Sequence, residues 1–195
     1  MAEPTIPRRA VLQGAGVLVA LMALAGPGTA EVRRWSVDPS QSAITMRIRA
    51  AGLTQTGRFE DWSGDIRFDP TTPESARVAI EVRAASLRMH QTALTTRAAG
   101  PEFLDVVRYP AIRFRLTSLQ PVSPGRFTAR AQVTVKGRTR EVVFPAALRV
   151  TGDAAQMTGG FALDRAAYDI GTQGPWNALI GRQVRVDVAL AVKAA

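Results

Sequence analysis

The sequence predicts an all-β protein: an antiparallel β-barrel of about eight to nine strands with one short helix capping or flanking it. From Trp35 onward, segments in which apolar and polar residues alternate recur along the chain, separated by turn residues. This period of two is typical of strands that bury one face. The arginines take the polar positions of these segments. That pattern favours a closed barrel with an apolar interior over the alternative, a two-sheet sandwich.

Most strand candidates show simple alternation. In residues 44–48, Ile44, Met46 and Ile48 alternate with Thr45 and Arg47, so the apolar side chains share one face. The other simple candidates are residues 35–37, 78–83, 112–116, 127–135, 142–150, 157–163 and 184–192. Small residues on or near the inner face leave room inside a barrel of this size. They are Ala129, Ala131, Ala146 and Ala147.

The candidate at residues 59–68 departs from simple alternation. Phe59 and Trp62 have opposite parity, whereas Trp62, Ile66 and Phe68 agree. A β-bulge adds one residue and re-aims the side chains that follow it. The parity change therefore predicts a bulge near residues 60–61.

The hydrophobic period changes in one segment, between Met89 and Tyr109. Pro101 and Glu102 precede Phe103, Val106 and Val107, which are spaced as one face of a helix. We therefore expect a short helix over residues 102–107. Residues 171–181 are rich in glycine and are expected to form a long loop that carries Trp176.

The first thirty residues have the order of an export signal. Arg8 and Arg9 precede an apolar run over residues 15–25, and small residues follow up to Ala30, after which cleavage is expected. The arginine pair is similar to a twin-arginine signal, although Val11 and Gln13 depart from the usual pattern; Sec export is the alternative. Residues 31–195 then form one barrel domain. Cleavage removes two arginines and one glutamate, so the formal charge changes from +9 to +8.

Composition removes most catalytic and metal-binding apparatus. The chain has no Cys and a single His, His90, so we expect no disulfide, no cysteine catalysis, no ordinary zinc site and no cofactor. A hydrolase built on a carboxylate pair is the less favoured enzymatic alternative. Its candidates are Asp61, Asp65, Asp164 and Asp169. Nucleic-acid binding is not expected, since aromatic residues are not interleaved with the basic ones.

Several motifs together resemble the YceI-like family of lipid-binding, lipocalin-like barrels. They are "DPSQSAI" from Asp38, "GRFEDWSGDIRFDP" from Gly57, "AASL" from Ala84, "EFLDVVRYPAIRF" from Glu102, "VTVKGRTREV" from Val133 and "LDRAAYDIG" from Leu163. The resemblance covers nearly all of the chain after residue 30. It implies an exported, periplasmic protein that encloses a polyisoprenoid or another long aliphatic molecule, and it does not indicate which one.

The chain departs from the family pattern where relatives often carry histidine or an Arg-Asp pair. At the histidine positions this chain has Gln41, Ala50, Arg97 and Lys136, and at the pair it has Leu94 and Thr95. We therefore expect no histidine-dependent contact to a metal or haem. An apolar cavity does not need histidine.

The predicted ligand site is the inner face of the barrel. The residues expected to line it are Ile44, Met46, Ile48, Phe68, Ile80, Phe103, Ile112, Phe114, Phe127, Val133, Phe144, Phe161 and Trp176, with Phe103 and Trp176 at its mouth. Arg165 is a candidate for contact with a polar headgroup; a structural ion pair is the alternative. A filled core, in a stress-related or surface-binding barrel, is the alternative to a ligand cavity.

A basic exterior is expected from the arginines of opposite parity. They are Arg47, Arg49, Arg83, Arg113, Arg115, Arg130 and Arg185. Such a surface attracts anionic lipid headgroups, so peripheral contact with a membrane is one interpretation. The other is a solvated face that keeps the barrel soluble.

Overall fold

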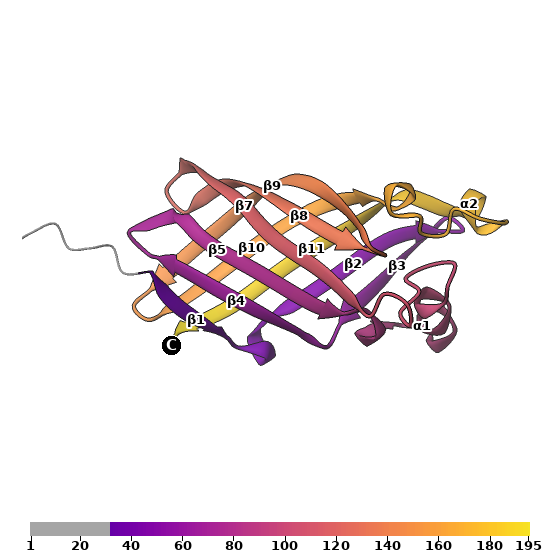
Figure 1. Cartoon of the computed structure of the whole chain (residues 1–195), viewed down its shortest axis with the longest axis horizontal. Coiled ribbons are helices and arrows are strands. Elements are labelled where there is room, and N and C mark those ends of the chain that lie inside the picture. Colours follow the sequence, from indigo (N-terminus) through magenta and orange to yellow (C-terminus); the bar gives the residue numbers. More distant parts are fainter. Residues whose placement is uncertain (1–31) are drawn as a thin grey trace, which may run out of the picture.

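The computed structural model describes residues 32–195, which form a single β-barrel with short helical segments (Figure 1). The strands are β1 (Arg33–Val37), β2 (Ala43–Ala50), β3 (Leu53–Phe59), β4 (Trp62–Asp69), β5 (Thr72–Arg83), β6 (Leu87–Met89), β7 (Ala111–Ser123), β8 (Arg126–Val135), β9 (Arg138–Thr151), β10 (Ala154–Asp164) and β11 (Ile180–Ala194). The α-helices are α1 (Thr92–Ala99) and α2 (Trp176–Leu179). The 3-10 turns are η1 (Pro39–Gln41), η2 (Ala84–Ser86) and η3 (Arg165–Tyr168).

The eleven strands occupy eight positions, here called staves, around a closed antiparallel barrel, because at three of these positions the strand is interrupted and counts as two. β1 and β2 both pair with β11 and are separated only by η1. β4 pairs with β1, and β3 pairs with β2. β5 pairs with β4, and β6 pairs with β3, so β5 and β6 together form the next position in the barrel. β7 to β11 complete the ring, and the pairing of β1 with β11 closes it, which confirms the predicted fold class.

The bulge predicted near Glu60 and Asp61 is a full break between two strands. β3 ends at Phe59 and β4 begins at Trp62. The amide of Glu60 donates to the carbonyl of Ser86, and the carbonyl of Asp61 accepts from the amide of Arg83. These bonds hold the bend against η2 on the neighbouring stave, and they explain the parity change between Phe59 and Trp62.

The helix predicted over residues 102–107 is wrong. Those residues form consecutive turns, and the helix α1 lies earlier, at Thr92–Ala99. Gly100 caps α1, and Pro101 cannot continue it. The amides of Leu104 and Val106 donate to carbonyls of α1, at Ala98 and Ala99, instead of within a helix of their own. Val107, expected on the buried face, is 94% exposed.

Two smaller expectations also change. The loop expected over residues 171–181 contains the single turn α2, and β11 begins at Ile180, ahead of the predicted residue 184. The short strand β6 has no counterpart among the predicted strands. The helix α1 flanks one end of the barrel, in agreement with the predicted fold class (Figure 1).

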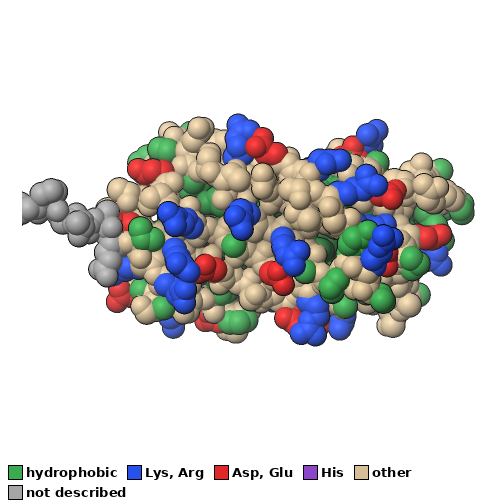
Figure 2. Space-filling view, in the orientation of Figure 1, with side chains coloured by type: hydrophobic (Ala, Val, Ile, Leu, Met, Phe, Trp, Pro, Cys, Tyr) green, Lys and Arg blue, Asp and Glu red, His purple; other side chains and the backbone are tan. Residues whose placement is uncertain are grey.

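Side-chain parity follows the prediction. All the arginines expected outside are exposed. Figure 2 shows Lys and Arg side chains beside Asp and Glu side chains on the visible face. Five of the arginines expected outside form ion pairs: Arg47 and Arg185 with Asp187, Arg83 with Asp61, Arg113 with Glu81, and Arg130 with Glu141. These ion pairs neutralise much of the positive charge of the expected basic exterior. Contact with an anionic membrane through the barrel wall stays a prediction that these pairs do not favour.

The predicted signal over residues 1–30 lies outside the described residues. Within residues 32–195, no helix has the length and apolar character needed to span a bilayer.

Candidate functional site

The barrel encloses an elongated apolar cavity of about 460 Å³. Its lining extends from Phe68 and Phe127, near the chain termini, to Trp176 and Leu179, at the end that carries both helices. Nearly all lining side chains are aliphatic or aromatic. The size falls within the usual range of small-molecule sites, about 300–1,000 Å³. A space of this size favours a ligand cavity over the filled-core alternative.

Every residue predicted to line the cavity does so. The register explains this, because residues opposite each other on paired strands point to the same face. Ile80 lies opposite Phe114, and Phe114 lies opposite Val133. That these residues bind a ligand stays a prediction.

An aromatic cluster forms one wall. The ring centroids of Phe144 and Phe161 are 5.1 Å apart, and each lies 6.2 Å from that of Phe114. These offset geometries are favourable for aromatic pairs. Gly159 lies beneath the cluster, where a Cβ would come within 2.8 Å of the ring of Phe144. Phe144 and Phe161 are buried, whereas Phe114 is half-buried because it faces the open space.

The end of the barrel near the termini is closed. Trp35 on β1 stacks on Phe68 of β4 with ring centroids 4.4 Å apart and an interplanar angle of 8°. The indole Nε1 donates to the carbonyl of Phe68 at 3.1 Å, which satisfies the only polar atom of the indole. Ile66 and Val192 are buried beside the pair. The pair therefore forms the floor of the cavity.

The opposite end reaches solvent. There the lining residues Ala51, Leu53, Gln91, Arg97 and Leu179 are exposed. The guanidinium carbon of Arg97, on α1, lies 4.1 Å from the ring centroid of Trp176, on α2. The two helices thus meet across the opening, and this end is the mouth of the cavity.

A segment over residues 101–105 covers part of the mouth. Phe103 is buried against Gly171, where the backbone has a φ of +58° and a Cβ would lie 2.9 Å from the phenyl ring. Both constraints require glycine. The amide of Gly171 donates to the carbonyl of Glu102 at 2.7 Å, and the ammonium of Lys136 donates to the carbonyls of Pro101 and Asp169. Lys136 therefore links residues 101–105 to the segment around Asp169 and Gly171, against which Phe103 packs.

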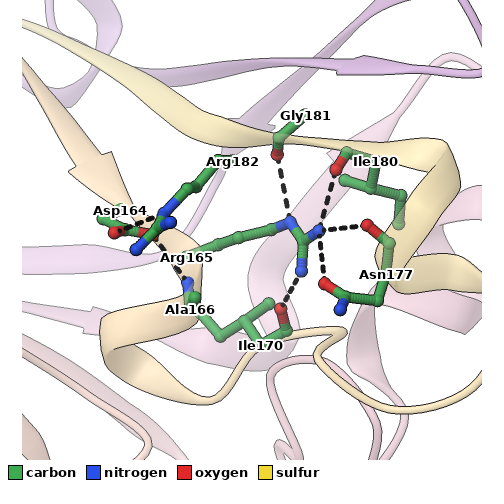
Figure 3. Close-up of polar contacts among 8 residues, drawn as sticks. All are labelled: Asp164, Arg165, Ala166, Ile170, Asn177, Ile180, Gly181 and Arg182. Carbon is green, nitrogen blue, oxygen red and sulfur yellow. Dashed lines mark hydrogen bonds and ion pairs between the residues drawn. The ribbon is translucent and has the colours of Figure 1, made fainter.

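Arg165 holds the base of the α2 loop together. Its side chain is buried, and its guanidinium donates to the carbonyls of Gly181, Ile180, Asn177 and Ile170 at 2.8–3.0 Å (Figure 3). It also donates to the carbonyl of Gly171 at 2.8 Å. A sixth contact joins it to the Oδ1 atom of Asn177 at 3.1 Å. These acceptors use all the N–H donors of a guanidinium. The geometry favours neither the expected headgroup contact nor an ion pair; it gives Arg165 a structural role.

The four aspartates considered for a hydrolase each lie beside a hydrogen-bond donor or a cation. The hydrogen bond from Arg182 lowers the pKa of Asp164, and the hydrogen bond from Thr172 lowers the pKa of Asp169. Burial raises the pKa of the Tyr168 hydroxyl, against a smaller opposite effect of Arg140. Asp61 pairs with Arg83, and the hydrogen bond from Arg67 lowers the pKa of Asp65. A general acid needs a raised carboxyl pKa, so these contacts do not favour the hydrolase alternative.

Metal ligation finds no support among residues 32–195. They contain no group of three or more His, Cys, Asp or Glu side chains that could hold an ion. His90 is exposed, and it lies just before α1.

Sequence reasoning missed lining residues outside its predicted strands. Leu53 and Gln55 line the cavity from β3, and Leu94 and Ala98 line it from α1. Leu53 and Gln55 share parity with Phe59, which is the signal that could have extended this strand toward the mouth. Leu94 and Ala98 are four residues apart, a spacing that places them on one face of a helix.

The comparisons with known proteins agree with this architecture. The family model for the YceI-like domain matches residues 35–192. A UPF0312 protein of Pseudomonas savastanoi pv. phaseolicola is 27% identical over 128 residues, which cover 61% of this chain and 64% of that protein. A UPF0312 protein of Pseudomonas putida strain KT2440 is 26% identical over 165 residues, covering 78% of this chain and 83% of that protein. The chain thus spans less than two thirds of the first relative.

Solved structures share the fold at low identity. Burkholderia cenocepacia BcnA has a TM-score of 0.75 at 20% identity, covering 80% of this chain and 99% of that chain. A polyisoprenoid binding domain from Saccharophagus degradans has a TM-score of 0.67 at 15% identity, covering 84% and 99%. These likenesses show the fold, and the match of the family model over residues 35–192 shows that the chain belongs to the YceI-like domain family.

Proposed function

We propose that the protein is an exported carrier that encloses a polyisoprenoid or another long aliphatic molecule in the barrel cavity. The observation that carries this proposal is the apolar space of about 460 Å³, closed at the Trp35–Phe68 floor and open at the mouth. The structural neighbour described as a polyisoprenoid binding domain supports the ligand class. The function is binding and needs no cofactor or nucleic acid.

The energetics of burial support a long apolar ligand. Burying about ten methylene groups contributes about 8 kcal/mol, at about 0.8 kcal/mol each. Association costs of about 4 kcal/mol or more reduce this gain. An aliphatic chain therefore binds with useful affinity through the lining alone.

Filling the cavity should remove the ligand without unfolding the barrel. Val188 on β11 lines the cavity and is half-buried, whereas its neighbour Ala189 is exposed on the outer face. We expect Val188→Trp to abolish copurification of an apolar mass in native mass spectrometry, because the new indole occupies the space. Ala189→Trp is the matched control and should retain the mass. Loss of the mass in both variants, or in neither, contradicts the proposal, and so does wild-type protein that carries no apolar mass after gentle isolation.

Export should remove the first thirty residues. The arginine pair, the apolar run and the small residues at its end predict that protein recovered from the periplasm begins at Glu31, as terminal sequencing or intact mass will show. Replacement of Arg8 and Arg9 together by Lys should block export by the twin-arginine route. Unchanged export of that double variant would assign the chain to the Sec route. Periplasmic protein that still carries Met1 to Ala30 would contradict cleavage.

A further inference from the structure

Within the part of the chain that the structure describes, the cavity lining carries two cations and no acid. Its charged members, all within the described part of the chain, are Arg97 and Arg165. Arg165 is buried and donates to backbone and amide oxygens through every guanidinium nitrogen. It has no donor to offer a ligand. Arg97, the other cation on the lining, has guanidinium donors that the described residues leave free to bind a ligand.

Arg97 is held at the mouth without polar partners in residues 32–195. It lies in the last turn of α1 and is exposed, and no hydrogen bond or ion pair of its guanidinium is formed with another described side chain or carbonyl. Its contact is the face of Trp176, at 4.1 Å. A planar guanidinium stacked on a ring keeps its N–H donors in its own plane, where they can bind a carboxylate or phosphate in bidentate fashion.

Arg97 lies beside the mouth of the apolar cavity that would hold the aliphatic tail of a ligand. Leu94 and Ala98, on the same helix, and Leu179, beside Trp176 on α2, line the apolar cavity. The floor at Phe68 lies at the opposite end. A chain that fills the cavity from the floor therefore places its polar end beside Arg97.

We propose that Arg97 and Trp176 form a headgroup site that selects long-chain amphiphiles with an anionic head, a carboxylate or a phosphate. This site rests on the proposed carrier function and specifies its ligand class. Trp176 shields one face of the guanidinium from water and holds the side chain in place, so less freedom is lost when the head binds. The site takes the role that the sequence suggested for Arg165.

The test compares ligands that share a tail and differ in the head. Displacement of the fluorescent probe N-phenylnaphthylamine from the full mature protein is measured with dodecanoate, dodecyl phosphate and dodecanol. Charge-assisted hydrogen bonds are strong, but the site is open to solvent, so we expect the anions to bind about tenfold more tightly than the alcohol. Arg97→Gln should abolish this preference while the affinity for dodecanol stays unchanged. A preference for only one anion identifies the head as a carboxylate or a phosphate.

The matched control is Arg108→Gln. Arg108 is also exposed and also stacks on an aromatic ring, that of Tyr109, but it does not line the cavity. It should leave the preference intact. Equal affinity of wild-type protein for all three compounds overturns the headgroup site and leaves the carrier function standing, as does an equal effect of both variants. Failure of the probe and of all three compounds to bind overturns the carrier function itself.

Discussion

Arg165→Ala should cause the largest loss of stability of any single substitution at the mouth. Five carbonyl groups and one amide oxygen accept hydrogen bonds from this buried guanidinium. Truncation leaves them without their donor, and breaking a buried charged network of this kind costs about 3–5 kcal/mol. For a domain of this size, we expect the melting temperature to fall by about 6–20 °C in thermal unfolding followed by circular dichroism.

Two variants control this measurement. Arg165→Lys keeps the charge, but one ammonium cannot reach acceptors on both sides of the loop, so most of the loss should remain. Arg182→Ala removes an exposed arginine that pairs with Asp164, and it should cost about 0–1 kcal/mol. If Arg165→Ala is no worse than Arg182→Ala, the structural role assigned to Arg165 is wrong.

Phe114→Arg should abolish either folding or retention of the apolar ligand. Phe114 faces the cavity, and its ring centroid lies 6.2 Å from those of Phe144 and Phe161. Among residues 32–195, no acidic side chain lines the space, so a guanidinium there would be unpaired, and burying an unpaired charge costs several kcal/mol. Thermal unfolding and displacement of the fluorescent probe measure the two outcomes.

The neighbouring residue provides the control. Arg113 lies on the outer face of the same strand, is exposed and pairs with Glu81. Arg113→Gln removes only this surface pair and should change the free energy of unfolding by about 0–1 kcal/mol, with ligand retained. A Phe114→Arg protein that melts and binds like the Arg113→Gln protein would refute the inside and outside assignment of β7.

The barrel and its lining are predictable because strand periodicity is local. Along residues 127–135 every second side chain is apolar, and Phe127, Ala129, Ala131 and Val133 are all buried. A closed antiparallel sheet then brings these faces together whatever the exact strand ends are. The interruption at Glu60 and Asp61 was visible only as a change of parity, since its cause is hydrogen bonding to the distant residues Arg83 and Ser86.

The mouth is less predictable because its structure depends on contacts between distant segments. Phe103 and Val107 have helical spacing, but the backbone of this segment bonds to the carbonyl groups that end α1. The sequence "TALTTRAA" of α1 carries one large apolar residue, Leu94, and no residue of the helix is buried, so periodicity is a weak signal there. The acceptors of Arg165 come from residues 170–181. Most of them are backbone carbonyl groups, so the local sequence pattern does not predict that they converge on one guanidinium.

The Trp35–Phe68 floor makes the interior a blind tunnel, and this limits how ligand length can affect binding. A chain that enters tail first can advance only until its terminal methyl group reaches the phenyl ring of Phe68. Up to that length each added methylene gains about 0.8 kcal/mol. Beyond it, further carbons project through the mouth into water and gain little. Across a homologous series, affinity should therefore rise steeply and then level off. If the proposed carrier function holds, we expect the protein to accept long chains of different lengths and to discriminate against short ones.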